Sequence, residues 1–102
     1  MDEALALCAV DLGGRAHSDI EPRPDPLTAT NVWLELWPHF VETLAREARA
    51  SVHLEVRRAR STHHLVEGGA KALARALRQA WEPDPRLAGA ADAVPSSKGT
   101  LR

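Results

Sequence analysis

Residues 51–57, with the sequence SVHLEVR, alternate between apolar and polar side chains. Neighbouring side chains of a strand point to opposite faces, so Val52, Leu54 and Val56 are predicted to face the core. His53 is expected on the outward face, as an ordinary surface residue. The stretch therefore predicts a half-buried strand, and it separates two segments that have helical periodicity.

Each of these flanking segments predicts an amphipathic helix. Over residues 30–49, apolar side chains from Trp33 to Ala48 recur at spacings of three and four and are expected to face the core. Proline is tolerated only in the first turn of a helix, so Pro38 places the regular start near Trp37. The second helix is expected to end near residue 81, before two prolines, and its N-cap is one of two hydroxyl residues, Ser61 or Thr62.

The N-terminal segment predicts two more strands. An apolar run over residues 4–12 ends in Gly13-Gly14, and residues 15–21 alternate, with His17 expected at the surface. We expect these strands to pair as a hairpin around the two glycines. The predicted fold class is therefore α+β: a strand-strand-helix-strand-helix half-unit with a small sheet and two helices packed on one face.

Length and composition limit the classes of function. A chain of 102 residues is one domain over residues 1–102, and its small size favours association with partner subunits. A net charge of −1 and the absence of a long apolar run predict neither a nucleic-acid nor a membrane partner. The acidic N-terminus lacks the basic start of a secretory signal, and Cys8 is the single cysteine, so a cytoplasmic setting is expected. The basic cluster at residues 57–60 is interpreted as a solvated loop.

The strongest chemical pattern is His63-His64 followed by Glu67 at the start of the second helix. His63 and Glu67 lie one turn apart on the same face, and His64 is also a neighbour of Glu67. Adjacent histidines point about 100° apart on a helix, so two metal ions could each take one. Imidazole with carboxylate suits Mn, Fe, Zn, Ni or Co. A solvated helix start with two surface histidines remains the alternative.

Other candidate residues are weaker when taken alone. His39 lies beside the apolar stripe of the first helix, where a histidine is more often half-buried than a ligand. Lys71 either pairs with Glu67 or receives an anion beside the metals. The tail segment at residues 96–99, which contains Ser96 and Lys98, offers hydroxyl, backbone and ammonium donors that suit a phosphate, although such tails are commonly only solvated.

Taken in order, these segments resemble imidazoleglycerol-phosphate dehydratase, the dehydratase of histidine biosynthesis. The resemblance covers nearly the whole chain, but it covers only the second half of the family's sequence. The paired histidines, the basic helix after them and the Pro-Ser-Ser-Lys-Gly tail are specific in combination. The matching segments are MDEAL at 1–5, DLGGR at 11–15, His39-Phe40, VHL at 52–54, THHLVE at 62–67, KALARALR at 71–78 and PSSKGTL at 95–101.

The resemblance implies a ligand set that spacing alone does not give. It implies that the metal ligands, normally for Mn²⁺ in a two-metal site, are His39, His63, His64 and Glu67. It implies that the substrate phosphate is held by Lys71, Ser96 and Lys98, with residues 88–102 as a phosphate-binding tail.

The implied activity is a lyase reaction, the metal-dependent dehydration of imidazole glycerol phosphate to imidazole acetol phosphate. The family assembles into homo-oligomers, and its first half carries further ligands that have no counterpart here. The chain is therefore expected to need complementary halves from partner chains. The alternative is a catalytically inactive metal-binding or oligomer-forming fragment or descendant of that enzyme. Pro38 and the Gly68-Gly69 pair depart from the family pattern.

Overall fold

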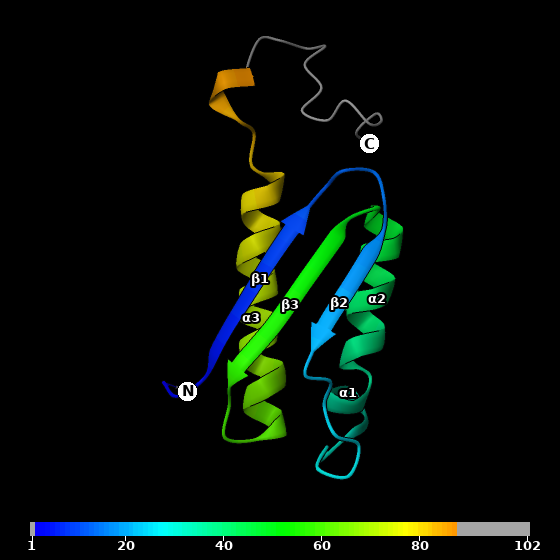
Figure 1. Ribbon diagram of the computed structural model, residues 1–102, viewed down its shortest axis with the longest axis vertical. Helices are drawn as coiled ribbons and strands as arrows, with labels where there is room; N and C mark the ends of the chain where they lie inside the picture. The colour runs from blue at the N-terminus through cyan, green and yellow to red at the C-terminus, as the bar shows by residue number, and fades with distance from the viewer. Residues whose placement is uncertain (1, 88–102) are drawn as a thin grey trace.

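The strand predicted at residues 51–57 lies at the centre of a three-stranded sheet (Figure 1). This computed structural model describes residues 2–87. The sheet consists of β1 (Leu5–Asp11), β2 (His17–Glu21) and β3 (Ser51–Arg58), in the order β1-β3-β2. The helices are α1 (Val32–Glu35), α2 (Trp37–Ala48) and α3 (Thr62–Trp81), followed by the short 3₁₀ helix η1 (Pro85–Leu87).

The predicted hairpin between the first two strands is wrong. β3 lies between them, antiparallel to β1 and parallel to β2. The link at residues 12–16 passes the end of β3 and is held there by its backbone: the N–H of Gly14 donates to Arg49 O (3.1 Å), and the N–H of His17 donates to Ala50 O (3.1 Å). Gly14 has a φ of 90°, a conformation that suits glycine. The link therefore carries β2 past β3 instead of turning back along β1.

Helix α2 begins at Trp37, as the position of Pro38 predicted. The preceding residues form the separate helix α1, whose first turn is capped by Asn31 Oδ1 accepting from the N–H of Leu34 (3.2 Å). Pro38 occupies the first turn of α2, where its missing N–H removes no intrahelical bond. The predicted apolar stripe is partly wrong, because Trp33 is 76% exposed and Phe40 is 54% exposed.

Helix α3 has the boundaries that the sequence predicted. The side chain of Ser61 is the N-cap and accepts from the N–H of His64 at 3.1 Å, and the helix ends at Trp81. Gly69 is buried, and a Cβ added there would lie 3.4 Å from Leu54 Cδ2 and 3.5 Å from Trp37 Cζ2. At this position α3 therefore packs against both β3 and the start of α2, at ordinary van der Waals distance for an added methyl group.

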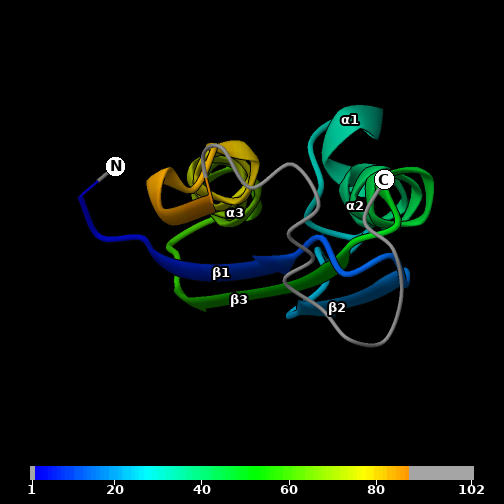
Figure 2. The ribbon, with the colours of Figure 1, turned by 90° about the horizontal axis from the view of Figure 1, so that it is seen from above.

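The core lies between the sheet and the helices on one of its faces, as predicted (Figure 2). Val52, Leu54 and Val56 are buried there, with Val41 of α2 and Leu73 of α3 packed over the sheet. No helix of residues 2–87 covers the opposite face, which is called the open face below. None of the helices in this described range is long and apolar enough to cross a membrane.

Candidate metal centre

Three of the predicted site residues form a row along the outer surface of α3. His63 Nε2 lies 3.2 Å from Glu67 Oε2, and Lys71 Nζ lies 3.2 Å from Glu67 Oε1. Each pair is four residues apart, so the helix itself sets the contacts. The row therefore places one imidazole and one ammonium on the two oxygens of a single carboxylate.

The charges in this row favour the ionised form of Glu67. A hydrogen bond from Lys71 and its positive charge are the main causes that lower the pKa of Glu67 from 4.5, with a smaller contribution from His63. Partial desolvation acts in the opposite direction. Glu67 is thus held as a carboxylate, which is the form that binds a cation.

His64 turns away from this row and meets the N-terminal segment. Its Nδ1 is shielded from solvent and lies 2.8 Å from Glu3 Oε1, although without the alignment of a hydrogen bond. Glu3 is itself fixed, because its Oε2 accepts from the N–H of Arg60 at 3.1 Å. Burial alone would raise the pKa of Glu3, but the Arg60 N–H and the His64 ring outweigh it and lower the pKa.

Sequence reasoning missed Glu3. It lies 61 positions before His64, and no periodicity relates the two. Only the antiparallel pairing of β1 with β3 brings the segment before β1 next to the start of α3. A carboxylate beside an imidazole nitrogen is the arrangement that orients metal-binding histidines elsewhere, with the second ring nitrogen free to act as a ligand.

His39 is placed on a different helix from the other predicted ligands. It lies on the exposed surface of α2, near the start of that helix. Within residues 2–87, one group of three or more potential ligand residues has its donor atoms within 4.8 Å of one another, and that group contains none of the predicted ligands. A single copy of this chain therefore does not gather His39 with His63, His64 and Glu67.

The predicted phosphate-binding residues are only partly placed. Lys71 lies on α3, where it lines a shallow groove of about 740 Å³ with Arg75 and Arg78. These three cations at intervals of four and three residues lie along one side of the helix. Ser96 and Lys98 lie outside the described residues, as does the predicted tail at 88–102.

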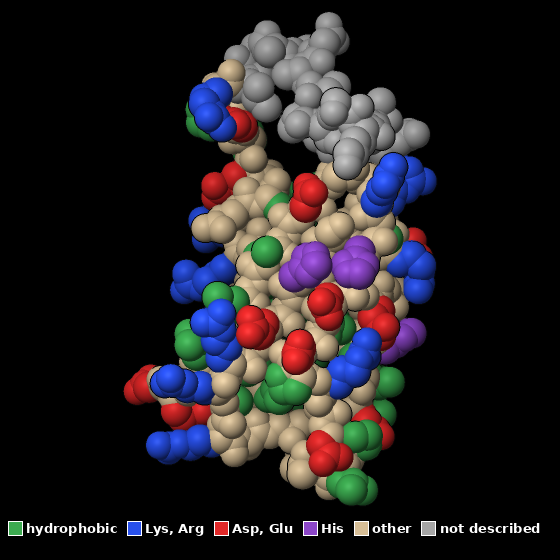
Figure 3. All heavy atoms as spheres, in the orientation of Figure 1, with side chains coloured by type: hydrophobic (Ala, Val, Ile, Leu, Met, Phe, Trp, Pro, Cys, Tyr) green, Lys and Arg blue, Asp and Glu red, His purple; other side chains and the backbone are tan. Residues whose placement is uncertain are grey.

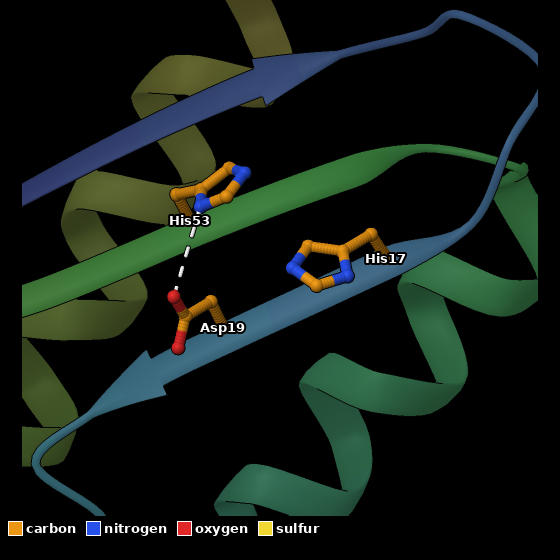
Figure 4. Close-up of side chains that lie close together, drawn as sticks. All are labelled: His17, Asp19 and His53. Atoms are coloured by element: carbon orange, nitrogen blue, oxygen red, sulfur yellow. Dashed lines mark ion pairs between the residues drawn. The ribbon is translucent and has the colours of Figure 1, made fainter.

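The one group of potential ligands that is brought together within residues 2–87 was not predicted. His17, Asp19 and His53 lie side by side on the open face (Figure 4). His53 Nδ1 is 3.9 Å from Asp19 Oδ2, and the rings of His17 and His53 are 5.3 Å apart between centroids. Both histidines are exposed, as the sequence predicted. Their proximity was not predicted, because the expected hairpin did not pair β2 with β3.

The sequence of this chain is similar to that of a known enzyme family. Residues 1–77 match the family imidazoleglycerol-phosphate dehydratase. The chain is 41% identical over 101 residues to the imidazoleglycerol-phosphate dehydratase of Desulforamulus reducens and 44% identical over 101 residues to that of Pyrobaculum arsenaticum. In both cases 99% of this chain aligns, against 50% of the relative, so the chain spans about half the length of the curated relatives it matches.

The three-dimensional fold agrees with these sequence matches. The crystal structure of IGPD from Pyrococcus furiosus superimposes on this chain with a TM-score of 0.74 and 32% sequence identity. The aligned region covers 99% of this chain and 53% of the Pyrococcus furiosus chain. The predicted α+β half-unit is therefore confirmed, with β3 in the middle of its sheet. On this sequence and structural evidence, the chain belongs to the imidazoleglycerol-phosphate dehydratase family and corresponds to about half of its relatives' length.

Proposed function

We propose that this chain is one half of a metal-dependent lyase that dehydrates imidazole glycerol phosphate to imidazole acetol phosphate, with the complementary half supplied by a partner chain. The observation that carries the proposal is the start of α3, where two histidines and an ionised carboxylate stand on a helix of a family-matched half-unit. The similarity to these relatives, of which this chain spans about half, supports both the activity and the need for a partner.

The side chains at the start of α3 fit Mn²⁺ by their chemistry. A histidine whose other nitrogen faces a carboxylate, as His64 faces Glu3, is an oriented ligand. The rings of His63 and His64 are 5.8 Å apart and inclined by 64°, which suits two ions better than one. Bound divalent ions would stabilise the deprotonated imidazole of the substrate. In this proposal the ligands are His39, His63, His64 and Glu67, with His39 reaching the ions through assembly.

The phosphate of the substrate is assigned to the basic side of α3 and the tail. Lys71 is 63% exposed and contacts Glu67, so it places a cation directly beside the proposed metal ligands. Arg75 and Arg78 extend the positive surface along the same groove. A phosphate is bound well by ammonium and guanidinium groups. Ser96 and Lys98 would complete this subsite.

The requirement for a partner is supported by apolar surface on the helices. Trp33 on α1, Leu36 between α1 and α2, and Phe40 on α2 are between 44% and 76% exposed, and Trp81 is 57% exposed at the end of α3. Exposed large apolar side chains on a small domain are candidates for burial in an interface. A complementary half-unit, from a second copy or a separate chain, would bury these side chains and could bring His39 to the other ligands.

The second candidate is a fragment or descendant that binds metal or forms oligomers without catalysis. The observation that favours it is the separation of His39 from the other three ligands within one copy. An assembly that buried the exposed apolar side chains without uniting these four ligands would produce this outcome.

The test uses the purified full chain in its assembled form. We expect analytical ultracentrifugation to show an oligomer, and this oligomer to bind Mn²⁺ and to turn over imidazole glycerol phosphate. Glu67→Gln should abolish turnover and weaken Mn²⁺ binding. The matched control is Glu47→Gln, an exposed carboxylate on α2 whose nearest charged contact is Arg46 at 3.9 Å. Failure of every assembled form to bind Mn²⁺ refutes the metal assignment. Binding without turnover, both by the chain alone and with a complementary half added, selects the second candidate.

A further inference from the structure

We propose that His17, Asp19 and His53 form a second metal site, separate from α3, that binds one divalent transition ion such as Zn²⁺. The site lies on the open face, across the sheet from α2 and α3 (Figures 2 and 4). None of its residues belongs to the ligand set proposed for Mn²⁺. The inference therefore stands whether or not the chain is a dehydratase half.

The parallel pairing of β2 with β3 creates this cluster. Asp19 is directly opposite His53 in the register, and His17 is opposite Ser51. His17 and Asp19 are two residues apart on one strand, so their side chains point to the same face. Because paired residues of neighbouring strands also share a face, His53 joins them. Two rigid strands therefore hold all three donors without help from a loop.

The donors are close enough to converge on one ion. One ligand atom from each residue lies within 4.8 Å of the other two. A tetrahedral Zn²⁺ with ligands at about 2.0–2.1 Å holds its donor atoms about 3.3 Å apart. All three side chains are exposed, so small rotations about their side-chain bonds can close this difference. Two imidazoles and one carboxylate leave one coordination position for water.

The surroundings leave room for an ion and favour its charge. On the side of β1, the residue opposite His53 is Ala9, whose small side chain does not crowd the ring. A shallow depression of about 430 Å³ on this face is lined by Asp19 and His53 together with the carboxylates of Glu21 and Glu55. The space-filling view of the open face shows histidine and acidic side chains gathered over the sheet (Figure 3). One cation also lies close to these carboxylates, because Arg57 Nε is 3.5 Å from Glu55 Oε1.

The chemistry of the set selects the class of ion. Imidazole nitrogen is a borderline donor that suits Zn²⁺, Co²⁺, Ni²⁺ and Cu²⁺, whereas Mg²⁺ and Ca²⁺ prefer oxygen alone. A simple ion pair gives a weaker account of the cluster. His53 and Asp19 are 3.9 Å apart and more than half exposed, a geometry in which ion pairs contribute little, and such a pair assigns no role to His17.

The experiment titrates the metal-stripped full chain with Zn²⁺ by calorimetry and follows histidine ring resonances by NMR. At one equivalent of the ion, the resonances of His17 and His53 should shift together. The double variant His17→Gln/His53→Gln should lose one equivalent of Zn²⁺, and Asp19→Asn should weaken that equivalent at least tenfold. The matched control His63→Gln/His64→Gln removes two histidines from α3 and should still bind the equivalent of Zn²⁺ that is assigned to His17, Asp19 and His53.

Two results would overturn the proposal. One is a His17→Gln/His53→Gln chain that binds Zn²⁺ with the stoichiometry and affinity of the unmodified chain. The other is an unmodified chain in which the His17 and His53 resonances stay in place throughout the titration. The second readout needs no variant, so it decides the question even if the double variant fails to fold, which far-ultraviolet circular dichroism would reveal.

Discussion

The start of α3 and the open face each hold two histidines beside a carboxylate, but they are built in different ways. On α3, His63 and Glu67 meet because one helical turn separates them. On the open face, His53 meets Asp19 across two strands whose residues are 34 positions apart in the chain. A group of ligands on one helix is visible in the sequence, whereas a group completed across strands requires the order and direction of the strands.

The two regions also differ in completeness. The open face holds three donors that converge within one copy. The proposed ligands on α3 are separated from His39 in one copy, and the helices carry several exposed apolar side chains. We therefore expect metal binding on the open face to be independent of assembly and metal binding on α3 to depend on it.

The largest expected effect comes from removing the scaffold that both regions share. Leu54 is 3% exposed and faces α3 from β3, so Leu54→Ala should lower the free energy of unfolding by about 2–5 kcal/mol. The control is Leu7→Ala on the open face, where the side chain is 42% exposed and the change should stay within about 0.5 kcal/mol. Urea denaturation measures both, and equal losses would contradict this description of the core.

The next effect separates the two regions. Glu3 faces Nδ1 of His64, so Glu3→Gln should weaken Mn²⁺ binding by about 10–100-fold through loss of ring orientation. Zn²⁺ binding at His17, Asp19 and His53 should be unchanged. Calorimetry with each ion measures the difference. A loss of Zn²⁺ binding in this variant would show that the two regions are not independent.

A smaller effect concerns the packing of α3 on the sheet. A Cβ at Gly69 would make ordinary van der Waals contacts, and alanine favours a helix over glycine by about 1 kcal/mol. Gly69→Ala should therefore raise the free energy of unfolding by about 0.5–1 kcal/mol. Thermal and urea unfolding measure this gain. A loss of more than about 1 kcal/mol would mean that α3 packs on Leu54 and Trp37 too tightly for a methyl group.

The smallest effect concerns pH. Lys71 lowers the pKa of Glu67, so ionised Glu67 contributes stability above its unfolded value of 4.5, and that contribution is lost as the pH falls through the lowered pKa. Lys71→Met should move the pKa of Glu67 upward, toward 4.5. The range of pH over which this contribution to stability is lost should then become narrower. Carbon NMR of the carboxyl group measures the shift. Arg78→Met, which removes a distant pair with Glu82, should leave Glu67 unchanged.

Local signals predicted the helices and the central strand well. Pro38 fixed the start of α2 because a proline cannot sit deeper in a helix, and Ser61 marked the first turn of α3 as its cap. The alternation of Val52, Leu54 and Val56 predicted their burial. Each of these features depends on residues only a few positions apart, so the local sequence is enough to predict it.

Non-local features escaped prediction for the complementary reason. Gly13-Gly14 is compatible with a hairpin, and nothing nearby shows that the link is instead bonded to Arg49 and Ala50. The strand order, and with it the His17, Asp19 and His53 group, depends on pairing with a segment far along the chain. Glu3 was missed for the same reason. The burial of Trp33 and Phe40 was overestimated because their spacing matches the stripe, although their side chains face outward in a single copy.

The position of β3 in the sheet has a consequence for synthesis. Within the described sheet, β1 and β2 each bond only to β3. A ribosome therefore releases both early strands before their partner in this sheet, and none of the sheet's hydrogen bonds can form until residues 51–58 emerge. During that interval the nascent segment exposes two unpaired strands, which are open to chaperones and to other nascent copies.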